Sequence, residues 1–174
     1  MRKVYLQIST LEIMLTYTHR ALSAEDTPLL EQATLGTMNW CGPRFTLTDV
    51  RTRPEFSHYT RCKPARGDFG IAAYHDEEPA GVVWALYLSA DDPGYGYIDE
   101  TTPEVSLWVS EDHRGRGLGR ALLQAIISEA TTRNLPQISL SVEANNFARD
   151  LYLAEGFTPV VGREKDGVML RILS

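Results

Sequence analysis

The sequence lacks the features of several large protein classes. Among its 174 residues no apolar run approaches the roughly 20 residues that a membrane-spanning helix needs, so we expect no membrane partner. Positive charge is scarce. Lys and Arg number 17 against 23 Asp and Glu, a net charge of -6, which excludes the basic field of a general nucleic-acid-binding protein. The N-terminus is not typical of a signal peptide, because Glu12 and scattered polar residues interrupt it.

Cysteine is also nearly absent. Cys41 and Cys62 have neither CxxC spacing nor neighbouring His or Asp, and the histidines show no ligand spacing. We therefore expect no metal site and two free thiols, although the sequence leaves a disulfide open. With 43% hydrophobic residues, the chain is expected to form a single cytoplasmic domain over residues 1–174, with residues 1–13 as an N-terminal extension.

Hydrophobic periodicity predicts an alternation of strands and helices. Helices are expected after the capping signal at Ser23 and Asp26, through Met38, and at residues 48–61, 118–130 and 147–154. Strands are expected at residues 15–21, 69–74, 81–88, 104–109, 138–142, 157–161 and 168–173. An acidic, glycine-rich loop joins Asp91 to Thr102. This order predicts a mixed α/β fold with a largely antiparallel sheet of about six or seven strands, flanked by helices.

The most informative segment follows the strand predicted at residues 104–109. It is a glycine-rich turn that opens directly into a helix, Arg114-Gly115-Arg116-Gly117-Leu118-Gly119-Arg120. Glycines let backbone N–H groups approach a phosphate closely, and the helix N-terminus adds its positive dipole. The dipole disfavours arginines there by ~0.3–1 kcal/mol each, unless an anion binds. An exposed turn with surface arginines is the plainer alternative, because short glycine motifs give false positives.

Three phosphate-binding patterns can be compared with this loop. The P-loop pattern GxxxxGK[ST] is absent. The dinucleotide pattern GxGxxG has Arg120 at its third glycine, although Glu143 follows the next strand at the distance of a ribose contact, so an oxidoreductase is the weaker alternative. The pattern Arg-x-x-Gly-x-Gly fits, with Arg114, Gly117 and Gly119 in place.

This third pattern resembles the acyl-CoA loop of the GNAT superfamily of N-acetyltransferases. A second block is similar to the other signature of that family, at matching spacings: Asn145-Asn-Phe-Ala148-Arg-Asp-Leu151-Tyr152-Leu-Ala-Glu-Gly156-Phe157. The resemblance is strong over residues 104–157, moderate elsewhere, and does not include residues 1–13. It implies the GNAT fold and an enzyme that transfers an acetyl group from acetyl-CoA to a primary amine of a small molecule or a protein.

The resemblance also implies how acetyl-CoA is held. The backbone of Leu107, Trp108 and Val109 would pair with the pantetheine arm, and the loop from Arg114 to Arg120 would hold the phosphates. Asn145 would hydrogen-bond the pantetheine, or as an alternative would only cap the following helix.

Two residues are candidates for proton transfer. Glu104 is the candidate base for the protonated amine, with a solvated strand-edge glutamate as the alternative. Tyr152 is the candidate acid, since a phenol with a pKa of ~10 can donate to a leaving thiolate, with a buried structural tyrosine as the alternative. A non-catalytic acyl-CoA sensor on the same fold is disfavoured because both residues are present. The acceptor and a homodimer are left open.

Overall fold

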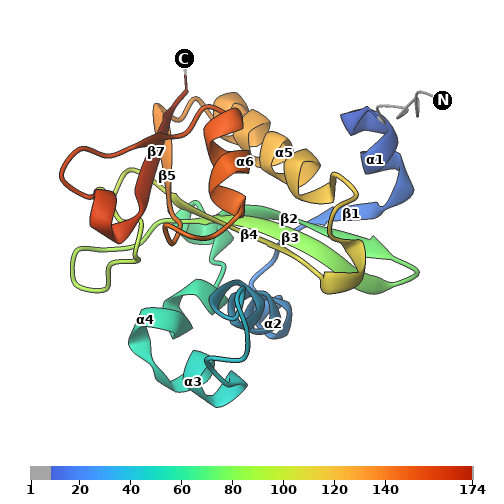
Figure 1. Ribbon diagram of the computed structural model, residues 1–174, viewed down its shortest axis with the longest axis horizontal. Coiled ribbons are helices and arrows are strands. Elements are labelled where there is room, and N and C mark those ends of the chain that lie inside the picture. Colours follow the sequence, from blue (N-terminus) through green and yellow to red (C-terminus); the bar gives the residue numbers. More distant parts are fainter. Residues whose placement is uncertain (1–8, 174) are drawn as a thin grey trace.

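A computed structural model describes residues 9–173, which form a seven-stranded sheet with helices on both faces (Figure 1). The order across the sheet is β1-β2-β3-β4-β5-β7-β6. The strands are β1 (Thr18–Ala21), β2 (Phe69–His75), β3 (Glu78–Leu86), β4 (Glu104–Val109), β5 (Gln137–Ser141), β6 (Thr158–Pro159) and β7 (Val168–Ile172). Every neighbouring pair is antiparallel except β4 and β5. The predicted mixed α/β class is confirmed.

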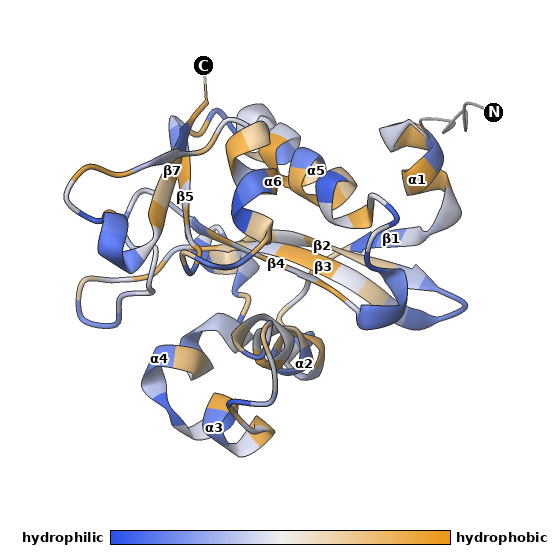
Figure 2. Cartoon of the chain, in the orientation of Figure 1, coloured by the Kyte–Doolittle hydropathy of each residue, from blue (hydrophilic) through white to orange (hydrophobic). Residues whose placement is uncertain are grey.

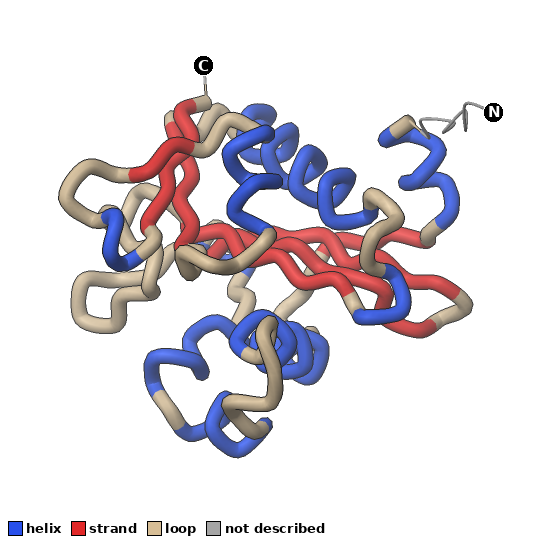
Figure 3. Tube along the Cα trace, in the orientation of Figure 1, coloured by secondary structure: helices blue, strands red, loops and turns tan. Residues whose placement is uncertain are grey.

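The helices divide between the two faces of the sheet. They are α1 (Thr10–Thr16), α2 (Thr27–Met38), α3 (Leu47–Thr52), α4 (Pro54–Ser57), α5 (Leu118–Thr132) and α6 (Ala148–Ala154). Figure 3 shows α1, α5 and α6 on one side and α2, α3 and α4 on the other. Short 3-10 turns occur at His58–Thr60, Pro64–Arg66, Glu111–His113 and Glu164–Asp166.

Each face of the sheet has its own apolar core. On one face α5 turns a stripe of fully buried residues, including Leu122 and Ile126, toward the strands. On the other face Leu30 of α2 is fully buried against a cluster that contains Trp84 and Trp108. Figure 2 shows the apolar colour gathered on the central strands, with polar residues on the loops and outer helix surfaces. Both faces of the middle strands are therefore buried, which explains the continuous apolar run in β3.

The parallel pair at the centre of the sheet determines where the site lies. Parallel strands need a long crossover connection, and α5 supplies it between β4 and β5. The two strands pair at a single Cα position, Glu104↔Ser139, where the Ser139 N–H donates to the Pro103 carbonyl at 3.1 Å. Beyond this pair the strands separate, and the facing edge of β4 has no partner strand.

The N-terminal expectation needs correction. The strand predicted at residues 15–21 begins only at Thr18, because Ser9 and Glu12 form a capping box that starts α1. Part of the segment expected as an extension packs on the fold, since Ile13 contacts the α5 core and Thr10 hydrogen-bonds Gln124 at 2.8 Å. Residues 1–8 of that expectation lie outside the described residues.

Other expectations hold with changed boundaries. The helix predicted at residues 48–61 is broken into α3, α4 and a 3-10 turn, because Pro54 cannot continue a helix and instead starts α4. The strand predicted at 157–161 shortens to β6.

Cys41 is exposed, Cys62 is buried, and both thiols are free. Within residues 9–173 no helix is both long and apolar enough to cross a membrane.

Candidate active site

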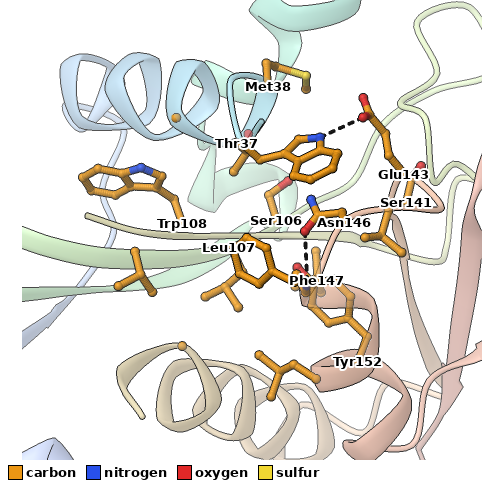
Figure 4. A pocket seen from close by; sticks show the side chains of 18 of the residues that line it. Thr37, Met38, Ser106, Leu107, Trp108, Ser141, Glu143, Asn146, Phe147 and Tyr152 are labelled. Atoms are coloured by element: carbon orange, nitrogen blue, oxygen red, sulfur yellow. Dashed lines mark hydrogen bonds between the residues drawn. The ribbon is translucent and has the colours of Figure 1, made fainter. Parts of the chain in front are cut away.

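A cavity of about 590 Å³ opens where β4 and β5 separate (Figure 4). Because the facing edge of β4 is unpaired, backbone N–H and C=O groups are left over for a ligand. We divide the lining into two ends. The glycine-loop end contains Leu107, Val109, Arg114, Gly115, Gly117, Gly119, Arg120, Leu151 and Tyr152. The aromatic end contains Trp40, Arg44, Phe45, Phe56, Tyr59, Tyr95, Glu104, Glu143 and Asp166.

The glycine loop has the backbone that the sequence predicted. Gly115 and Gly117 take left-handed φ values of 70° and 86°, which residues with a Cβ adopt only under strain. Gly117 is the residue before the first turn of α5, so the helix N-terminus begins directly beside the cavity. The first N–H groups of a helix have no intrahelical acceptor and carry a partial positive charge. This end of the cavity is therefore suited to a phosphate.

The arginines of the loop are less free than the sequence suggested. Arg114 donates from Nε to the Val109 carbonyl at 3.2 Å, and Arg120 pairs with Glu155 at 2.8 Å. Arg116 is exposed and does not line the cavity. Arg114 and Arg120 line the cavity, and Arg120 already has a carboxylate partner, so the role of these arginines in binding an anion stays a prediction. Leu118 also contributes no side chain to the cavity, since it is fully buried in the α5 core.

The end of β4 presents alternate faces to the two cores. Leu107 and Val109 are half-buried beside α5 and line the cavity. Trp108 points the other way, toward α2, as Figure 4 shows. Its indole lies directly against Gly36, where any Cβ would overlap the ring. A ligand at the open edge of β4 would meet the backbone of Leu107 and Val109, because the backbone of Trp108 faces Val82 of β3.

Glu104, the first residue of β4, is 5% exposed, so the alternative of a solvated strand-edge glutamate does not hold. Its Oε1 accepts hydrogen bonds from the Tyr59 hydroxyl at 2.7 Å and the Gly96 N–H at 3.0 Å. Its Oε2 is buried and has no partner within residues 9–173. Burial raises the pKa of Glu104 to about 7, against the lowering effect of the two donors. A carboxyl that titrates near neutrality is suited to act as a base.

Tyr59 joins Glu104 to the loop that precedes β4. Its hydroxyl accepts from the Tyr95 N–H at 2.8 Å while it donates to Glu104. Burial raises the pKa of Tyr59 well above its usual value, so it stays a donor. A Cβ at Gly94 would overlap the Glu104 carboxylate, and one at Gly96 would crowd the backbone of β5. Sequence reasoning missed Tyr59, and these two glycines were the available signal of a close approach.

Tyr152 lies on α6 and lines the same cavity (Figure 4). It is 8% exposed, and its ring meets Phe157 edge to face, with the centroids 6.0 Å apart. Burial raises the pKa of Tyr152 to about 12. The phenol is therefore protonated throughout the neutral range, as a proton donor must be.

Of the tandem asparagines after β5, Asn146 lies at the cavity, and the predicted role of Asn145 in binding the pantetheine stays a prediction. Asn145 is exposed and does not line the cavity. Asn146 lines it, and its Oδ1 accepts from the Ala148 N–H at 2.9 Å at the start of α6. The spacing to Ala148 favoured Asn145. Sequence reasoning could not show which of two adjacent asparagines lies at the cavity, because that depends on the path of the backbone after β5.

A clasp joins two distant segments at the aromatic end. Arg44 binds both carboxylate oxygens of Glu143, at 3.1 and 3.2 Å. The Trp40 indole donates to Glu143 at 2.7 Å, the dashed line to Glu143 in Figure 4. The clasp partners lie 99 and 103 residues apart in the chain. Glu143 is therefore committed to protein partners instead of the ribose contact that the dinucleotide alternative required.

The sequence profile of the acetyltransferase (GNAT) family matches residues 35–157, well over half of the chain. The chain belongs to this family. Its predicted reaction class, acetyl transfer with acetyl-CoA as co-substrate, is confirmed at the level of the family, and the sensor and oxidoreductase alternatives are not favoured.

Individual relatives agree with this assignment. Mycothiol acetyltransferase from Beutenbergia cavernae is 33% identical over 95 residues, which cover 54% of this chain and 30% of that protein. The chain thus spans under a third of that relative. Among solved structures, a Staphylococcus aureus acetyltransferase of the GNAT family has a TM-score of 0.66 at 14% identity, covering 91% of this chain and 99% of that one. YncA of Salmonella typhimurium, solved with acetyl-CoA, has a TM-score of 0.61 at 22% identity. The match covers 91% of this chain and 95% of that one.

The solved GNAT structures show the fold of this chain, an open and mostly antiparallel sheet flanked by helices. In the described part of the chain no group of three or more His, Cys, Asp or Glu is placed to hold a metal ion.

Proposed function

We propose that this GNAT protein transfers the acetyl group of acetyl-CoA directly to a primary amine, with Glu104 as base and Tyr152 as acid. One observation carries the proposal. The cavity between the separated strands brings together a buried carboxyl with a pKa of about 7 and a buried phenol with a pKa of about 12. Two groups whose environments give them such different pKa values are suited to opposite proton-transfer roles.

The glycine-loop end fits acetyl-CoA. The unpaired backbone at Leu107 and Val109 would bond the pantetheine, whereas the backbone of Trp108 faces Val82 of β3. The loop from Arg114 to Gly119 would hold the phosphates. Arg120 would contribute after exchanging its Glu155 partner, and Asn146 would take the role predicted for Asn145. When bound, acetyl-CoA supplies a thioester that an uncharged amine can attack.

Glu104 acts on the amine. At pH 7 a lysine-type amine is protonated, with a pKa of ~10.4, and has no lone pair for attack. The unpartnered Oε2 of Glu104 takes this proton, directly or through one water, while Tyr59 and Gly96 hold Oε1. The freed nitrogen then forms the N–C bond to the acetyl carbon.

Tyr152 acts on the sulfur. As the C–S bond breaks, the Tyr152 hydroxyl donates its proton to the departing thiolate, so the products are an amide and a thiol. Backbone N–H groups at the open edge of β4 donate to the carbonyl oxygen as negative charge develops there. The nitrogen, which carries a positive charge after the attack, loses its second proton as the amide forms, and this proton restores Tyr152 through water. Bulk water removes the proton held by Glu104.

The finer predictions stay part of this proposal. The acceptor is an amine of a small molecule or a protein, and residues 1–174 act as one acetyltransferase domain. The free thiols of Cys41 and Cys62 support a cytoplasmic location, because disulfides persist mainly in oxidising compartments. A homodimer stays a prediction, which light scattering at several protein concentrations would check.

Release of free thiol from acetyl-CoA over a panel of amines tests the proposal. We expect turnover with at least one amine, and a rising pH limb with a midpoint near 7 from Glu104. Glu104→Gln keeps a side-chain acceptor for Tyr59 and Gly96, so it should lose this limb and recover partly at high pH, where free amine is more abundant. Binding of acetyl-CoA by calorimetry without thiol release on any amine would instead support the sensor alternative.

A further inference from the structure

The aromatic end of the cavity has walls of unusual composition for a site that must admit a charged amine. Five of its lining residues are aromatic, and they come from four segments of the chain: Trp40, Phe45, Phe56, Tyr59 and Tyr95. Phe45 and Phe56 meet edge to face, with the centroids 4.9 Å apart. This pair is firmly held, because Phe56 is 3% exposed. Aromatic walls favour flat apolar groups by offset or edge-to-face contact.

The arginine that lines this end, Arg44, is already paired with a carboxylate of the protein. The Arg44 guanidinium donates four hydrogen bonds, two to the carboxylate of Glu143 and two to the Met38 carbonyl. Bidentate arginine–carboxylate pairing is the geometry with which a site would recognise a substrate carboxylate. In this chain the carboxylate that pairs with Arg44 belongs to the protein itself, at Glu143.

The neighbouring cations are paired as well. Arg53 lies over the Phe45 and Phe56 rings, 5.5 and 5.8 Å from their centroids, and binds Asp49 at 3.1 Å. Arg163 binds Asp166, which lines the aromatic end, at 2.9 Å. Among the described residues that surround this end, each arginine thus has a carboxylate partner, while the buried Glu104 forms no ion pair.

We infer that the aromatic end takes an arylalkylamine, a primary amine joined by a short chain to an aromatic ring, and discriminates against acceptors that carry a carboxylate. This inference rests on the proposed function and names the acceptor class of that same site. The ring would lie against Phe45 and Tyr95 while the amine reaches Glu104. A substrate carboxylate would enter this end with no free cation to receive it and with Glu104 nearby, so its desolvation is uncompensated.

Four matched acceptors test the two parts of the inference by thiol release at saturating acetyl-CoA. They are 2-phenylethylamine, phenylalanine, phenylalaninamide and n-butylamine. We expect kcat/KM for 2-phenylethylamine to exceed that for phenylalanine and for butylamine by about tenfold or more. Phenylalaninamide, which has the size of phenylalanine without its carboxylate, should recover most of the difference. An amide as poor as phenylalanine would overturn the charge argument.

Two variants sharpen the assignment to this end. Phe45→Leu keeps an apolar wall without the ring, so it should lower the ratio of kcat/KM for 2-phenylethylamine to kcat/KM for butylamine about three- to tenfold. Glu143→Gln removes the partner of Arg44 and should raise kcat/KM for phenylalanine about tenfold relative to 2-phenylethylamine. Glu129→Gln is the matched control, since Glu129 pairs with Arg133 at 2.8 Å outside the cavity and should change neither ratio.

The failure of this inference can be told from failure of the proposed function. Butylamine, or a short peptide with a free N-terminus, acetylated ten times better than 2-phenylethylamine would overturn the arylalkylamine assignment and leave acetyl transfer standing. An unchanged phenylalanine ratio in Glu143→Gln would overturn the role of the Arg44 pair. If no acceptor in the set or the wider panel released thiol, both the function and the inference would fall.

Discussion

The two ends of the cavity are built from the chain in different ways. The glycine-loop end comes mainly from one continuous stretch, residues 107–120, where strand, turn and helix N-terminus follow one another. The aromatic end is assembled from segments that are far apart in the chain, such as Trp40 and Glu143. A local stretch can encode backbone geometry by itself, whereas a wall of side chains needs the fold to bring it together. The comparison also separates cofactor binding from acceptor choice.

The two candidate proton-transfer residues sharpen the same comparison. Burial raises the pKa of both Tyr152 and Glu104. For the phenol this only strengthens the protonated state, whereas for the carboxyl it moves the titration into the neutral range. The same physical cause therefore keeps the Tyr152 hydroxyl protonated at one end and makes the charge of Glu104 depend on pH near neutrality at the other.

The largest expected effect is at the glycine-loop end. Tyr152→Phe keeps the ring and its contact with Phe157 but removes the proton donor, so kcat should fall by about 10²–10⁴-fold. Because the pKa of Tyr152 is about 12, raising the pH from 6 to 9 should not restore the rate. Steady-state kinetics with calorimetry of CoA binding checks this, with Tyr87→Phe, outside the cavity, as control. Unchanged turnover on a good acceptor would remove Tyr152 from the mechanism.

The next effect is on cofactor affinity alone. Gly117→Glu places a carboxylate where the phosphates would bind and strains a φ of 86°, so affinity for CoA should drop by about 100-fold or more. Gly162→Glu controls for the backbone strain, because Gly162 has a φ of 84° outside the cavity lining. The space around Gly162 is open, whereas a side chain at Gly117 also displaces Ile13, so the comparison is made on variants whose folded state circular dichroism has verified. Calorimetry of CoA binding to both folded variants measures the two affinities. Equal CoA affinity in the two variants would contradict a phosphate site at this loop.

A moderate effect is expected at the aromatic end. Tyr59→Phe removes a donor that lowers the pKa of Glu104, so that pKa should rise above about 7 and the rising limb of kcat/KM should move to higher pH. A shift of about one unit would lower activity at pH 7 about fivefold and leave it unchanged at pH 9. A uniform loss at every pH would mean that Tyr59 only supports the fold.

The smallest effects distinguish the loop arginines. Arg114→Ala and Arg120→Ala should each weaken CoA binding by several-fold at low salt and less at high salt, since screening reduces attraction between exposed charges. Arg120→Ala should have the smaller effect, because Arg120 pairs with Glu155 in the free protein and must give up that contact. Titrations of each variant with CoA at two ionic strengths measure the loss of affinity and its dependence on salt. A loss of affinity independent of salt would mean that these side chains act by packing.

Local sequence determined much of this protein. The apolar periodicity of α5 and β3, the glycine-rich turn before Leu118 and the spacing from Ala148 to Phe157 all depend on contacts within a few residues, so they could be predicted. Only the tertiary structure decided the burial of Glu104, its bond to Tyr59, the placement of Asn146 instead of Asn145 and the clasp of Arg44 on Glu143. A pKa and a charge balance depend on which groups share a small volume, and in this chain those groups lie up to 103 residues apart.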